Sequence, residues 1–135
     1  MRNNNEQLTP EEIQGLLDKW TKILNIEEWD YEVYLVDEEE YHDEFPNQER
    51  TTNACNKFAI DSKASQIFIK KETDLTFEEC LVHELIHIVL ADLTLFMDDL
   101  CEDRPESSKI LMSTATRYLE QAVHMLTKSH LRLTK

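Results

Sequence analysis

Two histidines and a glutamate interrupt the most apolar stretch of the chain. The stretch CLVHELIHIVLA runs from Cys80 to Ala91; nine of its twelve residues are apolar, and the other three are His83, Glu84 and His87. They form the pattern HExxH. Residues four apart lie one above the other on an α-helix, so the two imidazoles can converge on one Zn²⁺ ion with bonds of about 2.0–2.1 Å.

Glu84 has a different role because it follows His83 directly. One residue along a helix is a rotation of about 100°, so this carboxylate lies beside the metal and not on it. There it can take a proton from a zinc-bound water molecule. A metal also removes the cost of burying three ionisable groups in an apolar helix. The alternative is metal-free: both histidines are hydrogen-bonded core residues, and Glu84 forms a local salt bridge.

A catalytic zinc normally has a third protein ligand and one open position. The candidates after the motif are Asp92, Asp98, Asp99, Glu120 and His124. Asp92 is disfavoured because it lies about 140° from His87 around the helix axis. Glu120 is favoured because it is the only carboxylate side chain between residues 107 and 135, in a predicted helix that must pack against the motif helix. The alternative for Glu120 is an ordinary surface glutamate.

Composition limits the classes of partner. The chain has 135 residues, 41% of them hydrophobic, which predicts one domain with a sizeable core. A net charge of -14 repels phosphate backbones and anionic lipid, so we expect no direct nucleic-acid partner and no membrane partner. The three cysteines are scattered and form no CxxC pair. They favour a reducing, cytoplasmic setting over a disulfide framework or a cysteine zinc site.

The remaining patterns predict a single α+β domain over residues 10–135, preceded by a flexible tail over residues 1–9. Thr9 and Glu12 form a capping box for a helix that begins at Pro10. Alternation predicts a strand over 29–36, and residues 37–52 form an acidic, polar loop. Two strands, over 54–61 and 65–71, form a hairpin.

Thr76 is the expected N-cap of the motif helix, which we expect to end near residue 93. An aspartate-rich connection follows over 94–104, and a long final helix covers 105–131. The predicted domain therefore has an N-terminal helix, a small three-stranded sheet, a central HExxH helix and a long C-terminal helix.

This layout resembles the gluzincin group of zinc metallopeptidases, whose HExxH helix is followed by a helix that carries a glutamate ligand. It is closer still to the small single-domain minigluzincins and to predicted HExxH metallopeptidases of phages and prophages. A pattern like their E-x-x-V-x-x-L reads EQAVHML from Glu120 to Leu126. The resemblance implies a zincin-like fold and zinc as the cofactor. It also implies His83, His87 and Glu120 as ligands and Glu84 as the general base.

One departure from the thermolysin-like gluzincins concerns the surroundings of the third ligand. Those proteins carry it in NExxxD, whereas here Leu119 precedes Glu120 and His124 lies four residues after it. The groups that support Glu120 must therefore differ. A transition-state oxyanion also needs a donor besides zinc, and His124 and Tyr118 are the candidates.

In zincins, a strand at the edge of the sheet lies alongside the substrate peptide. The resemblance suggests the strand over 65–71, which includes Gln66 and Phe68, for this position. Such a strand binds a peptide by main-chain hydrogen bonds. The alternative is that it is an interior strand.

These expectations together predict zinc-dependent hydrolysis of peptide bonds, as an endopeptidase or amidase acting on a peptide or protein. Two alternatives come from other classes. The first is a zinc-binding scaffold or regulatory module without turnover. The second is a metal-free interaction protein whose acidic segment, residues 37–49, docks a basic partner.

Overall fold

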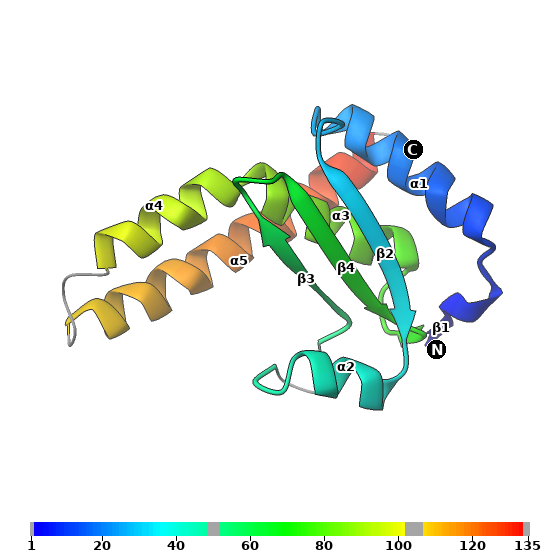
Figure 1. The fold of residues 1–135 in the computed structure, drawn as a ribbon, viewed down its shortest axis with the longest axis horizontal. Helices are drawn as coiled ribbons and strands as arrows, with labels where there is room; N and C mark the ends of the chain where they lie inside the picture. Colours follow the sequence, from blue (N-terminus) through cyan, green and yellow to red (C-terminus); the bar gives the residue numbers. More distant parts are fainter. Residues whose placement is uncertain (1, 49–51, 102–106, 134–135) are drawn as a thin grey trace.

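The computed structural model describes residues 2–48, 52–101 and 107–133. It confirms the mixed α+β class (Figure 1). The strands are β1 (Asn3–Asn4), β2 (Asp30–Val36), β3 (Ala54–Ala59), β4 (Ala64–Lys70) and β5 (Glu72–Thr73). The helices are η1 (Asn5–Gln7), α1 (Pro10–Ile23), α2 (Glu38–Glu44), α3 (Phe77–Val89), α4 (Ala91–Cys101) and α5 (Ser107–Leu133). No described helix is both long and apolar enough to cross a bilayer.

The main sheet has three strands in the order β2-β4-β3. β4 pairs antiparallel with β3, as the expected hairpin requires, and parallel with β2. The core lies between one face of this sheet and helices α1 and α3. Tyr31, Val33 and Leu35 of β2 pack against that core together with Trp29, which confirms the alternation read from the sequence.

The edge position suggested for the strand over 65–71 is wrong. β4 lies in the middle of the sheet, and its Ile67, Phe68 and Ile69 are all buried. Apolar side chains on both faces are typical of an interior strand with a parallel neighbour. The edge strand on the side of the motif helix is β3, which contacts α3 directly.

The acidic segment expected to be a loop forms helix α2. Asp37 caps its N-terminus in a reciprocal capping box with Glu40. Tyr41 is buried and packs with Val36 and Phe68 on the face of the sheet opposite the main core. The helix therefore forms because its first turn is capped and one aromatic residue anchors it to the sheet.

The region after the motif helix also differs from the expectation. α3 ends at Val89 and α4 begins at Ala91, where we expected one helix to about 93 and then a connection. The Leu90 amide donates to the carbonyls of Ile86 and Ile88, which closes the end of α3. Residues 102–106 lie outside the described part, and α5 is described from Ser107.

The segment expected to be a flexible tail is folded against the sheet in its described part. Asn3 and Asn4 pair with β5. Asn5 is 3% exposed, and its side-chain amide donates to the Lys70 carbonyl and the Thr73 hydroxyl. The expectation failed because this contact joins residues 65 to 68 positions apart, which local polarity does not reveal.

Candidate metal centre

The buried face of helix α3 fixes the orientation of the helix about its own axis. Thr76 caps its first turn by accepting from the Glu79 amide. Leu81, Val82 and Leu85 are fully buried in the core. Since residues four apart share a face of the helix, His83 and His87 come together on the side that faces α5, where each is partly exposed.

Helix α5 brings Glu120 to the two histidines. Val123, Thr127 and Leu131 are buried along α5, which packs against α3. Glu120 lies one turn before Val123, at the border of this packed face, and its side chain is 51% exposed. The third-ligand candidate is therefore held by the helix packing while it remains open to solvent.

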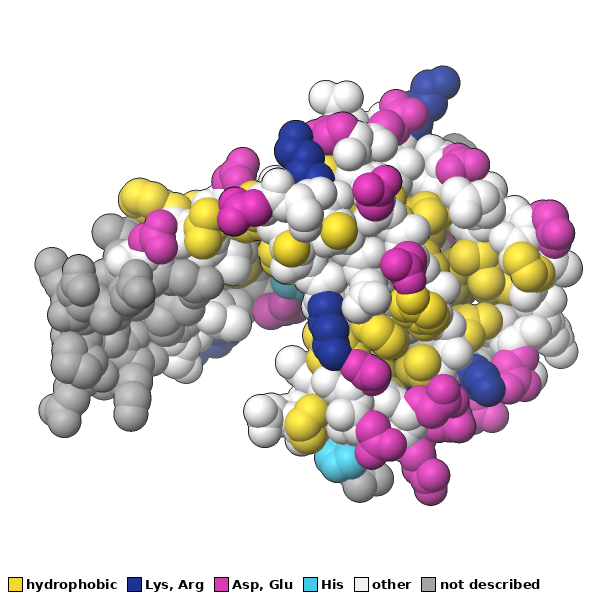
Figure 2. Space-filling view, viewed as in Figure 1, with side chains coloured by type: hydrophobic (Ala, Val, Ile, Leu, Met, Phe, Trp, Pro, Cys, Tyr) yellow, Lys and Arg dark blue, Asp and Glu magenta, His cyan; other side chains and the backbone are white. Residues whose placement is uncertain are grey.

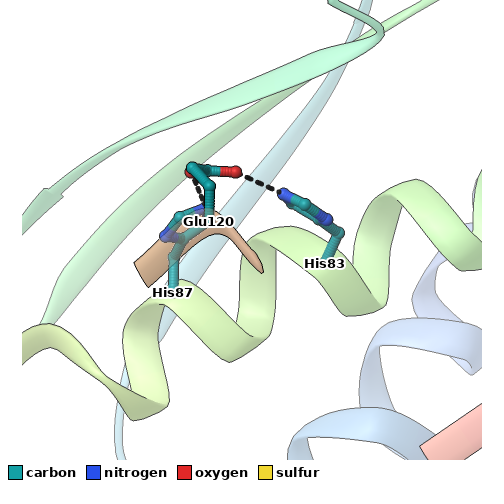
Figure 3. Close-up of side chains that lie close together, drawn as sticks. All are labelled: His83, His87 and Glu120. Carbon is teal, nitrogen blue, oxygen red and sulfur yellow. Dashed lines mark ion pairs between the residues drawn. The ribbon is translucent and has the colours of Figure 1, made fainter. Parts of the chain in front are cut away.

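The Glu120 carboxylate lies between both imidazoles (Figure 3). Its Oε1 is 2.8 Å from His87 Nε2, and its Oε2 is 3.3 Å from His83 Nε2. The structure thus brings together the three residues named as ligands from the sequence. Among the described residues, these are the only histidine, cysteine or acidic side chains grouped closely enough to hold a metal ion, with ligand atoms within 4.8 Å of one another.

Glu84 lies on the inner side of this cluster and is 5% exposed. The side-chain amide of Asn56, on β3, donates to its Oε2 at 2.9 Å and to its main-chain carbonyl at 3.1 Å. Asn56 reaches α3 because it pairs with Ile67, whose side chain lies in the core on the same face of the sheet. The motif glutamate is therefore fixed by the edge strand.

Close contacts and burial shift the pKa values of several groups at this cluster. Hydrogen bonds from His83 and His87 hold the pKa of Glu120 far below its usual range. Burial acts to lower the pKa of His87, but its hydrogen bond to Glu120 and the charge of Glu84 outweigh this, so the pKa is raised. Burial raises the pKa of Glu84, although the charges of both histidines oppose the rise. Without a metal, a protonated His87 beside an ionised Glu120 is thus favoured.

A cleft of about 630 Å³ opens at the cluster. In the view of Figure 2, histidine and acidic atoms are visible at the hollow between α5 and the part of the molecule that carries α2. Among its described lining residues are four carboxamides and three apolar side chains: Asn47, Gln48, Asn53, Asn56, Ala54, Phe58 and Leu75. Cys55 and Cys80 also line it, and burial raises the pKa of each thiol to about 12.

The candidate oxyanion donors and the other candidate ligands are not among the described residues that line this cleft. Tyr118 is 60% exposed, and its ring lies 5.3 Å from the Arg117 guanidinium. His124 is exposed, and neither residue is among the described residues that line the cleft. Asp92 and Asp99 are exposed on α4 and do not belong to the cluster. The side chain of Asp98 lies outside the described set.

Gln66 and Phe68, suggested as substrate-strand residues, point away from the metal cluster. Phe68 belongs to the aromatic group under α2, whereas Ile67 and Ile69 face α3. Asn56, whose side chain is hydrogen-bonded to Glu84, was not singled out from the sequence. Its position in the strand could have indicated it. In the β3–β4 hairpin Asn56 lies opposite Ile67, on the face that packs against the motif helix.

The donor set fits zinc. Two neutral imidazoles and a carboxylate are typical zinc ligands that leave a fourth position open. Bonds of about 2.0–2.1 Å in a tetrahedron separate ligand atoms by about 3.3 Å. The measured nitrogen–oxygen separations of 2.8 and 3.3 Å are close to this value. All ligand atoms of the cluster lie within 4.8 Å of one another.

Comparisons of the chain with protein-family models, with curated proteins and with solved structures found no match.

Proposed function

We propose that the chain is a zincin-like, zinc-dependent hydrolase of peptide bonds, an endopeptidase or amidase of the HExxH type. The observation that carries the proposal is the meeting of His83, His87 and Glu120 at an open cleft, with Glu84 beside them. His83, His87 and Glu120 would hold the metal, and the substrate would be a peptide or protein segment lying in the cleft.

Zinc in this site would polarise the scissile carbonyl and make water more acidic. Glu84 would accept the proton of the attacking water at its carboxylate and pass it to the leaving nitrogen, so that the amine departs neutral. Asn56 would hold Glu84 in position by donating to its carboxylate and to its main-chain carbonyl. β3, the edge strand next to α3, would align the peptide by main-chain hydrogen bonds.

A zinc-binding scaffold without turnover is the second candidate. Two observations favour it. Glu84 is 5% exposed and its carboxylate is hydrogen-bonded to Asn56, and neither Tyr118 nor His124 is among the described residues that line the cleft. The expected oxyanion donors are therefore not at the site. In a scaffold, the metal would serve the fold or a binding surface, and the acid–base properties of Glu84 would have no role.

Glu84→Gln separates the two candidates. This substitution keeps the shape of the side chain but removes its basicity. For a peptidase, we expect the zinc content to stay at one per chain and the cleavage rate to fall by about 10²–10⁴-fold. Zinc content and cleavage of a broad peptide library are measured side by side. Glu79→Gln, on the same helix but outside the cleft, is the matched control and should retain both.

Two outcomes would reject the peptidase. Unchanged cleavage by zinc-loaded Glu84→Gln protein would mean that another group is the base. Absence of cleavage by the zinc-loaded wild type across the library would favour the scaffold. If purified protein binds no zinc at all, both candidates fail, and the metal-free interaction protein remains.

A further inference from the structure

Exposed apolar side chains gather on the C-terminal helices. Of the eleven large hydrophobic residues that the structure describes as exposed, seven lie on α4 and α5. They are Leu93, Leu95, Phe96, Tyr118, Met125, Leu126 and Leu133. In Figure 2, hydrophobic side chains along α4 are visible at the surface, next to acidic ones. Exposed apolar side chains that gather on one pair of helices are typical of an interaction surface.

The exposed charges that α4 and α5 carry have opposite signs. The exposed acids Asp92 and Asp99 lie on α4. The exposed cations Arg117, Lys128 and Arg132 lie on α5, in a chain whose net charge is -14. Within the described part of the chain, none of these five residues has an ion-pair partner. Among the described residues, α4 therefore combines exposed apolar side chains with exposed acids, and α5 combines them with exposed cations that have no described ion-pair partner.

The two helices form a projecting pair. α4 packs along the first part of α5, and the pair extends away from the sheet (Figure 1). Such a pair is half of a four-helix bundle, in which two helical hairpins cover each other's apolar surfaces. A second hairpin of the same sequence would be complementary in charge if each acidic helix lay on the other's basic one.

We propose that two copies of this chain associate through the α4–α5 pair, with α4 of each copy lying against α5 of the other. A two-fold axis generates both contacts at once, because a surface that carries both signs is complementary to itself. Asp92 and Asp99 then face the cations of the second copy. Phe96, Tyr118 and the other exposed apolar side chains lose contact with water.

A second copy of the chain accounts for the charges of both helices. Each other class of partner accounts for the charges of only one. An anionic membrane or an acidic protein would attract α5 but repel α4 and the rest of an acidic chain. A basic protein would attract α4 but repel α5. This association is independent of the metal cluster and does not rest on the proposed function.

The test is the mass of the full chain in solution, measured by sedimentation equilibrium at micromolar concentrations. Two charge-reversed variants are made. Variant A carries Asp92→Lys and Asp99→Lys on α4, and variant B carries Arg117→Glu and Lys128→Glu on α5. We expect the wild type to be a dimer and each variant alone to be a monomer, since both contacts in its dimer become repulsive. An equimolar mixture of A and B should form a heterodimer, since both contacts become attractive again.

A matched control distinguishes these contacts from a general effect of net charge. Glu27→Lys with Asp43→Lys changes the net charge as variant A does, at exposed positions in the turn before β2 and on α2. This control should dimerise like the wild type. It should associate with variant B more weakly than variant A does, because only one of the two contacts is attractive in that pair. Phe96→Ser, at a side chain that is 58% exposed, should weaken the dimer without lowering the helix content seen by circular dichroism.

Three results would overturn the proposal. The first is a monomeric wild type over the whole concentration range. The second is a dimer that persists in both A and B, which would place the interface elsewhere. The third is a mixture of A and B that stays monomeric although both variants keep the wild-type circular dichroism spectrum.

Discussion

One nitrogen atom of Asn56 donates to two oxygens of Glu84. The distances are 2.9 Å to Oε2 and 3.1 Å to the main-chain carbonyl. A donor to a carboxylate stabilises its ionised form, and the second contact fixes the side chain relative to the helix backbone. Asn56 thus sets both the position and the orientation of the proposed general base, and it does so from the edge strand of the sheet.

Asn56→Ala should slow cleavage without releasing zinc. The variant removes both hydrogen bonds to Glu84, and groups that orient a metal site typically contribute about 10–100-fold to affinity or activity. We expect the loss in kcat, with little change in KM, because Asn56 acts on the base and not on the substrate. Asn47→Ala is the control, because Asn47 lines the same cleft and makes no described hydrogen bond to Glu84. An equal loss in both variants would contradict a specific role for Asn56.

Glu120→Ala should sharply weaken zinc binding, and Asp92→Ala should not. The Glu120 carboxylate lies 2.8 Å from His87 and 3.3 Å from His83, whereas Asp92 is exposed on α4. Zinc content after dialysis against a mild chelator measures the difference. Full retention of zinc by the Glu120→Ala protein would show that another group is the third ligand.

The HExxH part of the candidate metal cluster is the part of the site that the sequence predicts best, because its spacing lies within one helix. HExxH encodes the positions of two proposed ligands and a proposed base through helical periodicity alone. Glu120 could be named because it is the only acid in its helix. Asn56 could not, since its contact with Glu84 depends on the register that places it opposite Ile67 in the hairpin. A one-residue slip would turn it to the other face.

The errors in the fold have similar causes. The central place of β4 follows from its parallel pairing with β2, and no local pattern encodes that crossover. α2 was readable in principle, since Asp37 and Glu40 have capping-box spacing. The density of acids in that segment outweighed this signal. The fold of residues 3–5 depends on partners in and next to β5, about 70 residues away.

Zinc binding should strengthen as the pH rises from about 6 to about 8. The pKa of His87 is raised in the metal-free fold. The protonated ring therefore stabilises that fold fully below its unfolded pKa of about 6.5, and the contribution is lost as the pH passes the raised value. Zinc needs the neutral ring, so protons compete with it. The increase in Tm that zinc produces, measured against a strong chelator, should be larger at the higher pH. An increase that is equal at both pH values, or larger at the lower one, would contradict this.

Asn5→Ala should lower the free energy of unfolding by about 1–3 kcal/mol, the usual cost of leaving buried polar groups unpaired. The Asn5 amide donates to the Lys70 carbonyl at 2.8 Å and to the Thr73 hydroxyl at 3.1 Å, and the residue is 3% exposed. Urea unfolding gives the measurement, since a lower midpoint at unchanged slope reports lost stability.

Asn4→Ala is the matched control, because the Asn4 side chain is exposed and accepts only from the nearby Glu6 amide among the recorded contacts. Water can replace that partner, so the midpoint should move much less than in Asn5→Ala. If the two variants unfold at the same midpoint as the wild type, the N-terminal segment does not belong to the cooperative unit. Its pairing with β5 would then contribute nothing to holding the end of β4, and the flexible tail expected from the sequence would be the better description.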